Sequence, residues 1–368
     1  MEIYIIMGIV LLILLFKKHN KIEYDVAMLL LTMLSMLRAE SVGADMQNYI
    51  SEYYEYSMLS WKKILTCSEY SFAVVCKILN ILEVDKRGFI IAISILFSLL
   101  LRTAFKANRC NNYLVLYLYY MMGLYIQSFC IIRQSLAVVV SLIANSYLEE
   151  KYTCEQRNNR DCYCGKFNSV PIKYVIGMII AFGFHPTVIV IMLIPLFMMY
   201  YGKKKELKPV IFLRDGLIGM GIGMALFPKM YPFVLRNFRE KYQVLYGNDY
   251  AEMFGNIKSG ILIVAVCFIF YALYLNNWKK LSVKENIMVG SVIVSSFALS
   301  SLSIINSTLG RVNLFTEGLM VVMMSRLMEN SYRKIHSMNF WGIIFFLIYY
   351  ILYIMRDSIG VVPYKLVL

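Results

Sequence analysis

The stretch IMVGSVIVSSFALSSLSII, residues 287–305, contains no charged side chain over 19 residues. An α-helix needs about 20 mostly apolar residues to cross the hydrocarbon core of a bilayer. Similar apolar runs recur from residue 3 to residue 355, and no long polar interval separates them. The pattern predicts an all-α, polytopic integral membrane protein.

The composition agrees with a membrane protein. Of the 368 residues, 60% are apolar and 16% are charged, whereas soluble domains have about 45–50% apolar and about 25% charged residues. These values exclude an ordinary soluble enzyme. The net charge of +14 lies mostly in loops that flank the apolar runs. Because basic residues gather on the cytoplasmic side of membrane proteins, we expect no nucleic acid partner.

Ten apolar runs are candidate transmembrane helices, and we expect residues 1–368 to form a single membrane domain. The first run is expected to be a retained helix rather than a cleaved signal peptide. The runs are 3–16, 26–37, 88–105, 113–127, 131–148, 210–228, 259–276, 287–305, 312–328 and 340–355.

The basic clusters predict the orientation of these spans. With six clusters in the cytoplasm, the ten spans alternate without contradiction if 70–82 does not cross and 174–200 is a re-entrant helix pair. The loop 149–173 is then cytoplasmic, and the longer loops 38–87 and 229–258 are extracytoplasmic. In the alternative, 70–82 and 174–200 each cross once. That topology exports the basic residues of 102–109 and 149–173, so we favour the first.

Two helix-packing patterns occur late in the chain. Gly219 and Gly223 form G-x-x-x-G within an apolar run, which predicts a close contact between helices. The serines of 287–305 gather mainly on one side of the predicted helix, and we interpret them as a packing face. The lining of a polar cavity is the alternative interpretation.

Polar side chains near the outer ends of the spans are candidate binding residues. Arg38, Arg133 and Arg311 indicate an anion site, because guanidinium groups bind phosphate oxygens in a bidentate manner. The alternative for each arginine is an interaction with lipid head groups. Gln134 follows Arg133 between two apolar stretches. Tyr49 begins a tyrosine-rich stretch that predicts aromatic platforms for sugar rings, with an interfacial aromatic belt as the alternative.

The candidate bases also lie near the predicted outer ends of the spans. His185 precedes Pro186 at the break in 174–200, and a neutral imidazole can accept a hydroxyl proton near pH 7. Asp45 and Glu40 are competing bases, and Glu69 is a weaker one. A purely structural role is the alternative for His185.

We expect neither a metal ion nor a cofactor. Cys154, Cys162 and Cys164 have the spacing C-x7-C-x-C, and their loop contains no histidine. Zinc sites usually have paired elements of the type C-x2–4-C, so this spacing favours reduced thiols.

Five short motifs resemble the EpsG family, bacterial polysaccharide-synthesis membrane proteins related to the Wzy-type repeat-unit polymerases. The order and approximate spacing of the motifs are similar to the family over residues 30–200. Two departures are Ala44 inside Gly-x-Asp and Pro186 after the histidine. The motifs are LRAESVGADMQNY (37–49), SEYSF (68–72), IRQSLA (132–137), FHPT (184–187) and, more loosely, RVNLF (311–315).

The resemblance implies a polymerase that joins polyprenyl-pyrophosphate-linked oligosaccharide repeat units at the outer face of the bacterial cytoplasmic membrane. The product would be a capsular polysaccharide, an exopolysaccharide or an O-antigen-like polymer. Arg38, Arg133 and Arg311 would hold the pyrophosphate, and His185 or Asp45 would deprotonate the attacking hydroxyl. The partners would be the lipid-linked oligosaccharide, membrane lipids, and flippase and chain-length-regulator proteins.

Three other functions are alternatives. A glycan ligase would use the same lipid carrier but a different acceptor. A flippase or transporter of the lipid-linked unit would need no base. A structural scaffold of a glycan-export complex would leave the outward arginines unexplained.

Overall fold

A computed structural model describes residues 1–17, 20–110, 112–156, 170–204, 207–237, 257–305, 310–332, 337–356 and 360–366. Regular structure within these ranges is helical, and no strand occurs there. A single antiparallel bridge joins Arg38 to Leu366. The prediction of an all-α fold is confirmed.

The chain forms two compact units. The first consists of Met1–Lys151, Val170–Ile189 and Tyr332–Leu368, and the second of Tyr152–Ser169 and Val190–Ser331. Among the candidate site residues, Arg311 belongs to the second unit and the others belong to the first. The single membrane domain stays a prediction.

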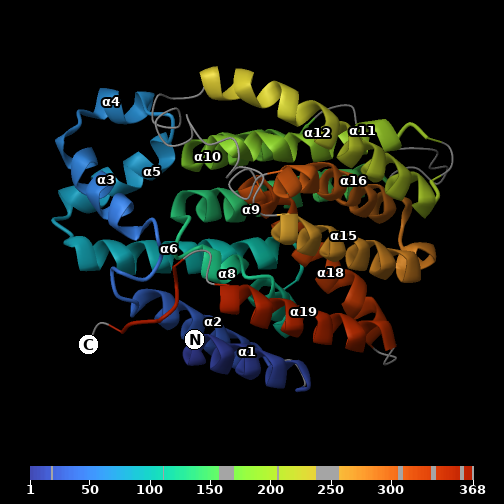
Figure 1. Cartoon of the computed structure of the whole chain (residues 1–368), viewed down its shortest axis with the longest axis horizontal. Coiled ribbons are helices and arrows are strands. Elements are labelled where there is room, and N and C mark those ends of the chain that lie inside the picture. The colour runs from blue at the N-terminus through green and yellow to red at the C-terminus, as the bar shows by residue number, and fades with distance from the viewer. Residues whose placement is uncertain are drawn as a thin grey trace. The chain divides into compact units, whose positions relative to one another are not determined.

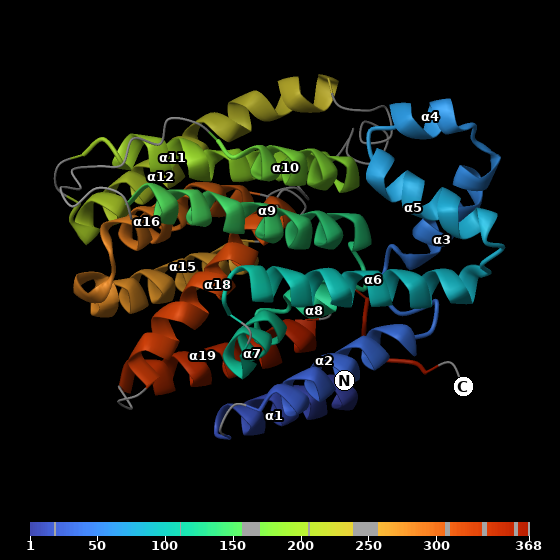
Figure 2. The same cartoon turned by 180° about the vertical axis from the view of Figure 1, so that it is seen from behind.

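The first unit contains most of the N-terminal helices (Figures 1 and 2). The helix α2 packs against α6, α1 packs against α7, and both α3 and α10 pack against α5. The predicted loop 38–87 is therefore itself largely helical. The helices are α1 (Glu2–Leu15), α2 (Lys21–Met36), α3 (Met46–Met58), α4 (Trp61–Thr66), α5 (Tyr70–Ile81), α6 (Lys86–Ala107), α7 (Tyr113–Met121), α8 (Leu124–Gln127), α9 (Ile132–Gln156), α10 (Ile172–Phe184) and α19 (Ser337–Arg356).

The predicted span 113–127 is not one helix, and that prediction is wrong. The helix α7 ends at Met121, and Gly123 has a φ of 75° before the short α8. Glycine adopts this left-handed conformation readily because it lacks a Cβ, and an α-helix cannot continue through it. With nine residues, α7 rises only about 13 Å, less than half of the hydrocarbon core.

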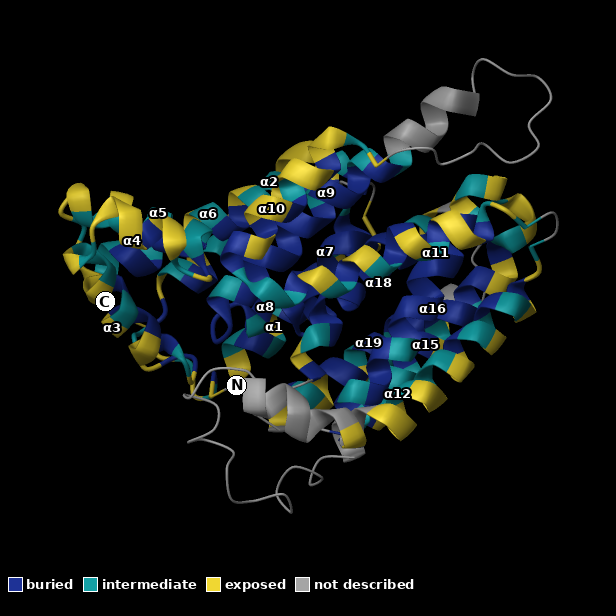
Figure 3. Ribbon diagram, turned by 90° about the horizontal axis from the view of Figure 1, so that it is seen from above, coloured by how far each residue is buried: buried dark blue, intermediate teal, exposed yellow. Residues whose placement is uncertain are grey.

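The second unit is organised around α16. This helix packs against α11, α12 and α15, and most of its residues are buried, whereas α12 exposes much of its surface (Figure 3). The apolar run 287–305 thus lies in the central helix of this unit. The elements are α11 (Leu193–Tyr201), α12 (Pro209–Asn237), α15 (Ile257–Asn277), α16 (Val283–Ile305), η3 (Arg311–Asn313) and α18 (Leu314–Tyr332).

The G-x-x-x-G pattern of α12 lies against α16, as predicted. A Cβ on Gly219 would lie 3.0 Å from Cβ of Ala298, and a Cβ on Gly223 would lie 2.3 Å from Oγ of Ser301. The two helices approach closely because these positions carry no side chain. The serines of α16 are buried, which fits the packing interpretation. Hydroxyls that donate to carbonyl groups of the preceding turn belong to Ser291, Ser295 and Ser300.

The described helices support a multi-pass membrane protein. Four stretches are long and apolar enough to cross a bilayer, namely Lys86–Ala107, Pro209–Leu226, Gly260–Lys280 and Val283–Ile305. Shorter apolar helices occur as well, so the total of about ten spans stays a prediction. Residues 174–200 fall into α10, the 3₁₀-helix η1 (Pro186–Met192) and α11, with the predicted break at His185. The re-entrant path of this segment stays a prediction.

Candidate functional site

Arg133, in the first turn of α9, is held between two carboxylates. Its Nη1 donates hydrogen bonds to Oε2 of Glu52 at 2.9 Å and to Oε2 of Glu69 at 2.6 Å. The side chains of Arg133 and Glu52 are each 20% exposed, and that of Glu69 is 11% exposed. The guanidinium is therefore largely buried and lies beside two negative groups.

Two aromatic rings flank this guanidinium. Its central carbon lies 5.1 Å from the ring centroid of Tyr49 and 5.8 Å from that of Phe72. Planar cations are attracted to such ring faces. Burial raises the pKa of the Tyr49 hydroxyl, so the hydroxyl stays protonated at neutral pH. Arg133, Glu52, Glu69, Tyr49 and Phe72 are called the Arg133 cluster below.

The sequence analysis missed Glu52 and ranked Glu69 only as a weaker base. A signal for Glu52 was present, because Tyr49, Glu52 and Tyr56 are spaced by three and four residues and share one face of α3. The signal for Glu69 was its position in the SEYSF motif. Neither signal indicates that the carboxylates pair with Arg133.

The SEYSF motif also joins the Arg133 cluster to α10. Directly after Glu69, the hydroxyls of Tyr70 and Ser71 donate to carbonyl groups in the last turns of α10. A Cβ on Gly183 would lie 2.2 Å from Oγ of Ser71, so glycine permits this contact. The start of α5 thereby contacts both Arg133 and the helix that ends before His185.

The surroundings of His185 favour one tautomer. Its Nδ1 lies 2.7 Å from Oγ1 of Thr187, and the backbone N–H of Thr187 donates to the same nitrogen at 3.4 Å. Because a backbone N–H can only donate, this contact favours the tautomer in which Nδ1 accepts and Nε2 carries the proton. In this tautomer His185 offers a hydrogen-bond donor, whereas a base requires a free ring nitrogen.

Asp45 lies in the motif 37–49, at the point where this motif comes close to the start of α9. Its Oδ2 accepts a weak hydrogen bond from Sγ of Cys130 at 3.5 Å. The approach depends on Gly43, which has a φ of 103° and whose N–H donates to the carbonyl oxygen of Gly360. A Cβ on Gly43 would lie 2.3 Å from the carbonyl oxygen of Phe129. The Gly-x-Asp spacing therefore brings a half-buried carboxylate near the motif that contains Arg133.

Gly43→Ala is expected to destabilise the fold by at least about 1–3 kcal/mol, because alanine is strained at this φ and its Cβ collides with backbone. The measurement is thermal unfolding of the purified protein in detergent. Gly221→Ala is the matched control, since a Cβ at Gly221 in α12 meets no atom within 4 Å and alanine favours helix. Equal unfolding temperatures for the two variants would contradict the assigned role of Gly43.

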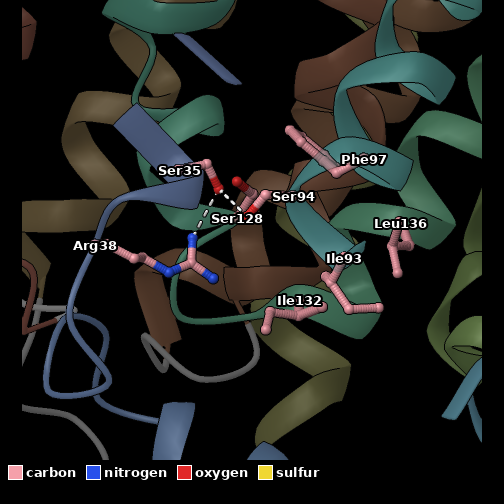
Figure 4. A pocket seen from close by; sticks show the side chains of 8 residues that line it. All are labelled: Ser35, Arg38, Ile93, Ser94, Phe97, Ser128, Ile132 and Leu136. Atoms are coloured by element: carbon pink, nitrogen blue, oxygen red, sulfur yellow. Dashed lines mark hydrogen bonds between the residues drawn. The ribbon is translucent and has the colours of Figure 1, made fainter. Parts of the chain in front are cut away.

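Arg38 is buried, and it does not pair with the carboxylates of the Arg133 cluster. Its side chain is 1% exposed, its Nη1 donates to Oγ of Ser35 at 3.0 Å, and its guanidinium lies 4.5 Å from the ring centroid of Phe129. It lines a cavity of about 10 Å³ together with Ile132, the neighbour of Arg133 (Figure 4). Such a cavity holds about one water molecule, so its size favours a ligand much smaller than pyrophosphate.

The remaining candidates are Gln134, Glu40 and Arg311. Gln134 is buried in α9 next to Arg133, and Glu40 forms an ion pair with Lys86 at 3.0 Å. Arg311 is exposed in η3 of the second unit. Its place in a common anion site with Arg38 and Arg133 stays a prediction.

In the described ranges, no group of three or more His, Cys, Asp or Glu side chains could hold a metal ion. The side chains of Cys154, Cys162 and Cys164 lie outside the described part of the chain, so the expectation of reduced thiols stays a prediction.

Comparison with known proteins identifies the family. The EpsG family model matches residues 21–155 and 166–366, which include every motif of the sequence analysis. No curated protein and no solved structure matches the chain. The family match covers more than half of the chain and agrees with the apolar helices of the structure. The chain therefore belongs to the EpsG family, a family of membrane proteins of polysaccharide biosynthesis.

Proposed function

We propose that this protein polymerises polyprenyl-pyrophosphate-linked oligosaccharide repeat units at the outer face of the bacterial cytoplasmic membrane. The product is a capsular polysaccharide, an exopolysaccharide or an O-antigen-like polymer. The observation that supports this proposal most is the Arg133 cluster, in which a buried guanidinium, two carboxylates and two aromatic rings meet within an EpsG-family chain.

The reaction requires three kinds of group. A sugar hydroxyl of one glycan attacks the anomeric carbon of another, and the bond from that carbon to the carrier pyrophosphate breaks. The hydroxyl proton passes to a base, and the polyprenyl pyrophosphate leaves with an additional negative charge. A fixed cation stabilises this charge, a base contributes typically about 10²–10⁴-fold, and aromatic faces bind sugar rings.

Arg133 is the proposed cation for the leaving group. Both of its hydrogen bonds to carboxylates use Nη1, and its buried Nε has no hydrogen-bond partner within the described ranges. A guanidinium has five N–H donors, so donors remain for a phosphate oxygen. Glu52 is more exposed than Glu69 and is the carboxylate that an incoming phosphate displaces more easily.

Asp45 is the proposed base, and His185 is the proposed donor to the pyrophosphate. The carboxylate of Asp45 is half-buried near the start of α9, whereas the Nδ1 of His185 already accepts from Thr187. The Nε2–H of His185 suits an anionic oxygen. Tyr49 and Gln134 complete the proposed site, with Tyr49 also supporting the guanidinium.

A synthetic lipid-linked repeat unit tests the proposal directly. Purified protein in liposomes is expected to convert it into a ladder of products that differ by one repeat, as seen by electrophoresis or mass spectrometry. A single transfer to a different acceptor would indicate a ligase instead. Movement of the intact unit across the bilayer without any transfer would indicate a flippase. Either of these outcomes would contradict polymerisation.

A further inference from the structure

The charge of Arg38 is not compensated by any described carboxylate. The side chain is 1% exposed, and the groups that act on it electrostatically are Tyr4, Tyr125, Tyr364 and a second cation, Arg87. Burying a charge without a counter-charge is strongly unfavourable in a protein interior. A negative group is therefore missing from the surroundings that the structure describes.

Part of the hydrogen-bonding capacity of Arg38 is also unused. Its Nη1 donates to Oγ of Ser35 at 3.0 Å, whereas its buried Nε has no hydrogen-bond partner among the described residues. The ring of Phe129 lies 4.5 Å from the guanidinium carbon and covers one face. A buried donor without an acceptor is destabilising, so both charge and donors indicate an anion.

The cavity beside Arg38 offers a place for such an anion (Figure 4). Three hydroxyls line it, from Ser35 in α2, Ser94 in α6 and Ser128 in the turn before α9. Ser35 donates to Ser94 at 2.8 Å, and Ser94 and Ser128 each donate to a carbonyl group, at 2.7 and 2.6 Å. Serine hydroxyls can rotate, so each of these groups can exchange its present acceptor for an anion that occupies the cavity.

Size and chemistry limit the ligand to one class. The cavity of about 10 Å³ holds a particle of about the size of one water molecule, which favours a single small ion over phosphate or pyrophosphate. The other lining residues are apolar, and Ile132 and Phe97 are two of them. Such walls suit a weakly hydrated, spherical anion better than a strongly hydrated one. A water molecule would fill the space but would leave the guanidinium charge uncompensated.

We propose that the cavity beside Arg38 is a binding site for one small halide ion, with chloride as the physiological ligand. Arg38 supplies the charge, and the hydroxyls of Ser35, Ser94 and Ser128 complete the shell. Because these residues come from α2, α6 and the segment before α9, the bound ion joins three parts of the first unit. The site is independent of the proposed polymerase activity.

Thermal unfolding at constant ionic strength tests the site. Purified full-length protein in detergent is titrated with chloride or bromide against gluconate. Wild type is expected to show a saturable rise of several degrees in Tm with either halide, because a ligand that binds only the folded state stabilises it. Gluconate is too large for the cavity and is expected to give no rise.

Variants connect the effect to the cavity. Arg38→Gln is expected to lose the halide-dependent rise. If that variant does not fold, Ser128→Ala serves instead and is expected to raise the half-saturating chloride concentration several-fold. Arg133→Gln is the matched control, which is expected to retain the full rise because Arg133 is not among the residues that line the cavity.

Three results would overturn the proposal. The first is a wild-type Tm that does not depend on the type of anion, which would mean that the counter-charge comes from within the chain. The second is a halide effect that persists unchanged in both cavity variants. The third is a stronger Arg38-dependent effect of pyrophosphate than of chloride, which would assign Arg38 to the carrier lipid. None of these readouts depends on polymer formation.

Discussion

Arg133→Lys is expected to lower polymer formation by about 10²-fold or more although the positive charge is kept. Arg133 contacts Glu52 and Glu69 through one nitrogen and lies over the rings of Tyr49 and Phe72. A lysine ammonium is a compact point charge that cannot reproduce the planar fork or its stacking. The measurement is the yield and length of polymer from a synthetic lipid-linked repeat at equal amounts of folded protein.

Arg102→Lys is the matched control for this substitution. Arg102 pairs with Asp25 at 2.6 Å, but both side chains are substantially exposed. Exposed ion pairs contribute only about 0–1 kcal/mol, so the control is expected to polymerise as wild type does. Full polymer yield and length in Arg133→Lys would mean that Arg133 only contacts lipid head groups or stabilises the fold.

Asp45→Asn is expected to lower turnover by about 10²–10⁴-fold while binding of the carrier lipid is retained, because asparagine cannot accept the hydroxyl proton. His185→Gln is expected to keep most of the activity, since the glutamine amide can replace the Nε2–H donor. The measurement is the initial rate of repeat transfer for each variant, together with binding of a labelled carrier.

The pH profile separates the two candidate bases. A base loses activity as the pH falls through its own pKa, because the protonated form cannot accept the proton. An imidazole base would set this acid limb near about 6.5, and a carboxylate base sets it lower. We therefore expect wild-type activity to persist below pH 6. An inactive His185→Gln protein beside an active Asp45→Asn protein would identify His185 as the base and contradict our assignment.

Local sequence patterns predict the helices, the helix break at His185 and the close helix contact, because these features depend on residues that are near one another in the sequence. Apolar runs predict helices because every backbone polar group must be satisfied within a segment that lies in lipid. The break at His185 follows from Pro186, which restricts the preceding residue to an extended conformation. The G-x-x-x-G pattern predicts the contact of α12 with α16 because small residues allow backbones to approach closely. The interruption at Gly123 was not predicted, since an isolated glycine is tolerated in many membrane helices.

The candidate site shows the limit of such patterns. Arg133 can be identified from sequence because a charge between apolar stretches requires a partner or a cavity. Its partners cannot, because Glu52 and Glu69 lie 81 and 64 residues away along the chain. Only the fold, which brings α3 and the start of α5 to Arg133, selects these two carboxylates.

The sequence by itself determined the helical membrane architecture and the EpsG family, and it predicted Arg38, Arg133, Asp45 and His185 as site residues. These properties follow from composition, spacing and short motifs, which can be identified without knowledge of how the chain folds. The tertiary structure alone decided that Arg133 lies between carboxylates and that Arg38 is buried beside a small cavity. Charge compensation and cavity size depend on side chains that are far apart in the sequence and that only folding brings together.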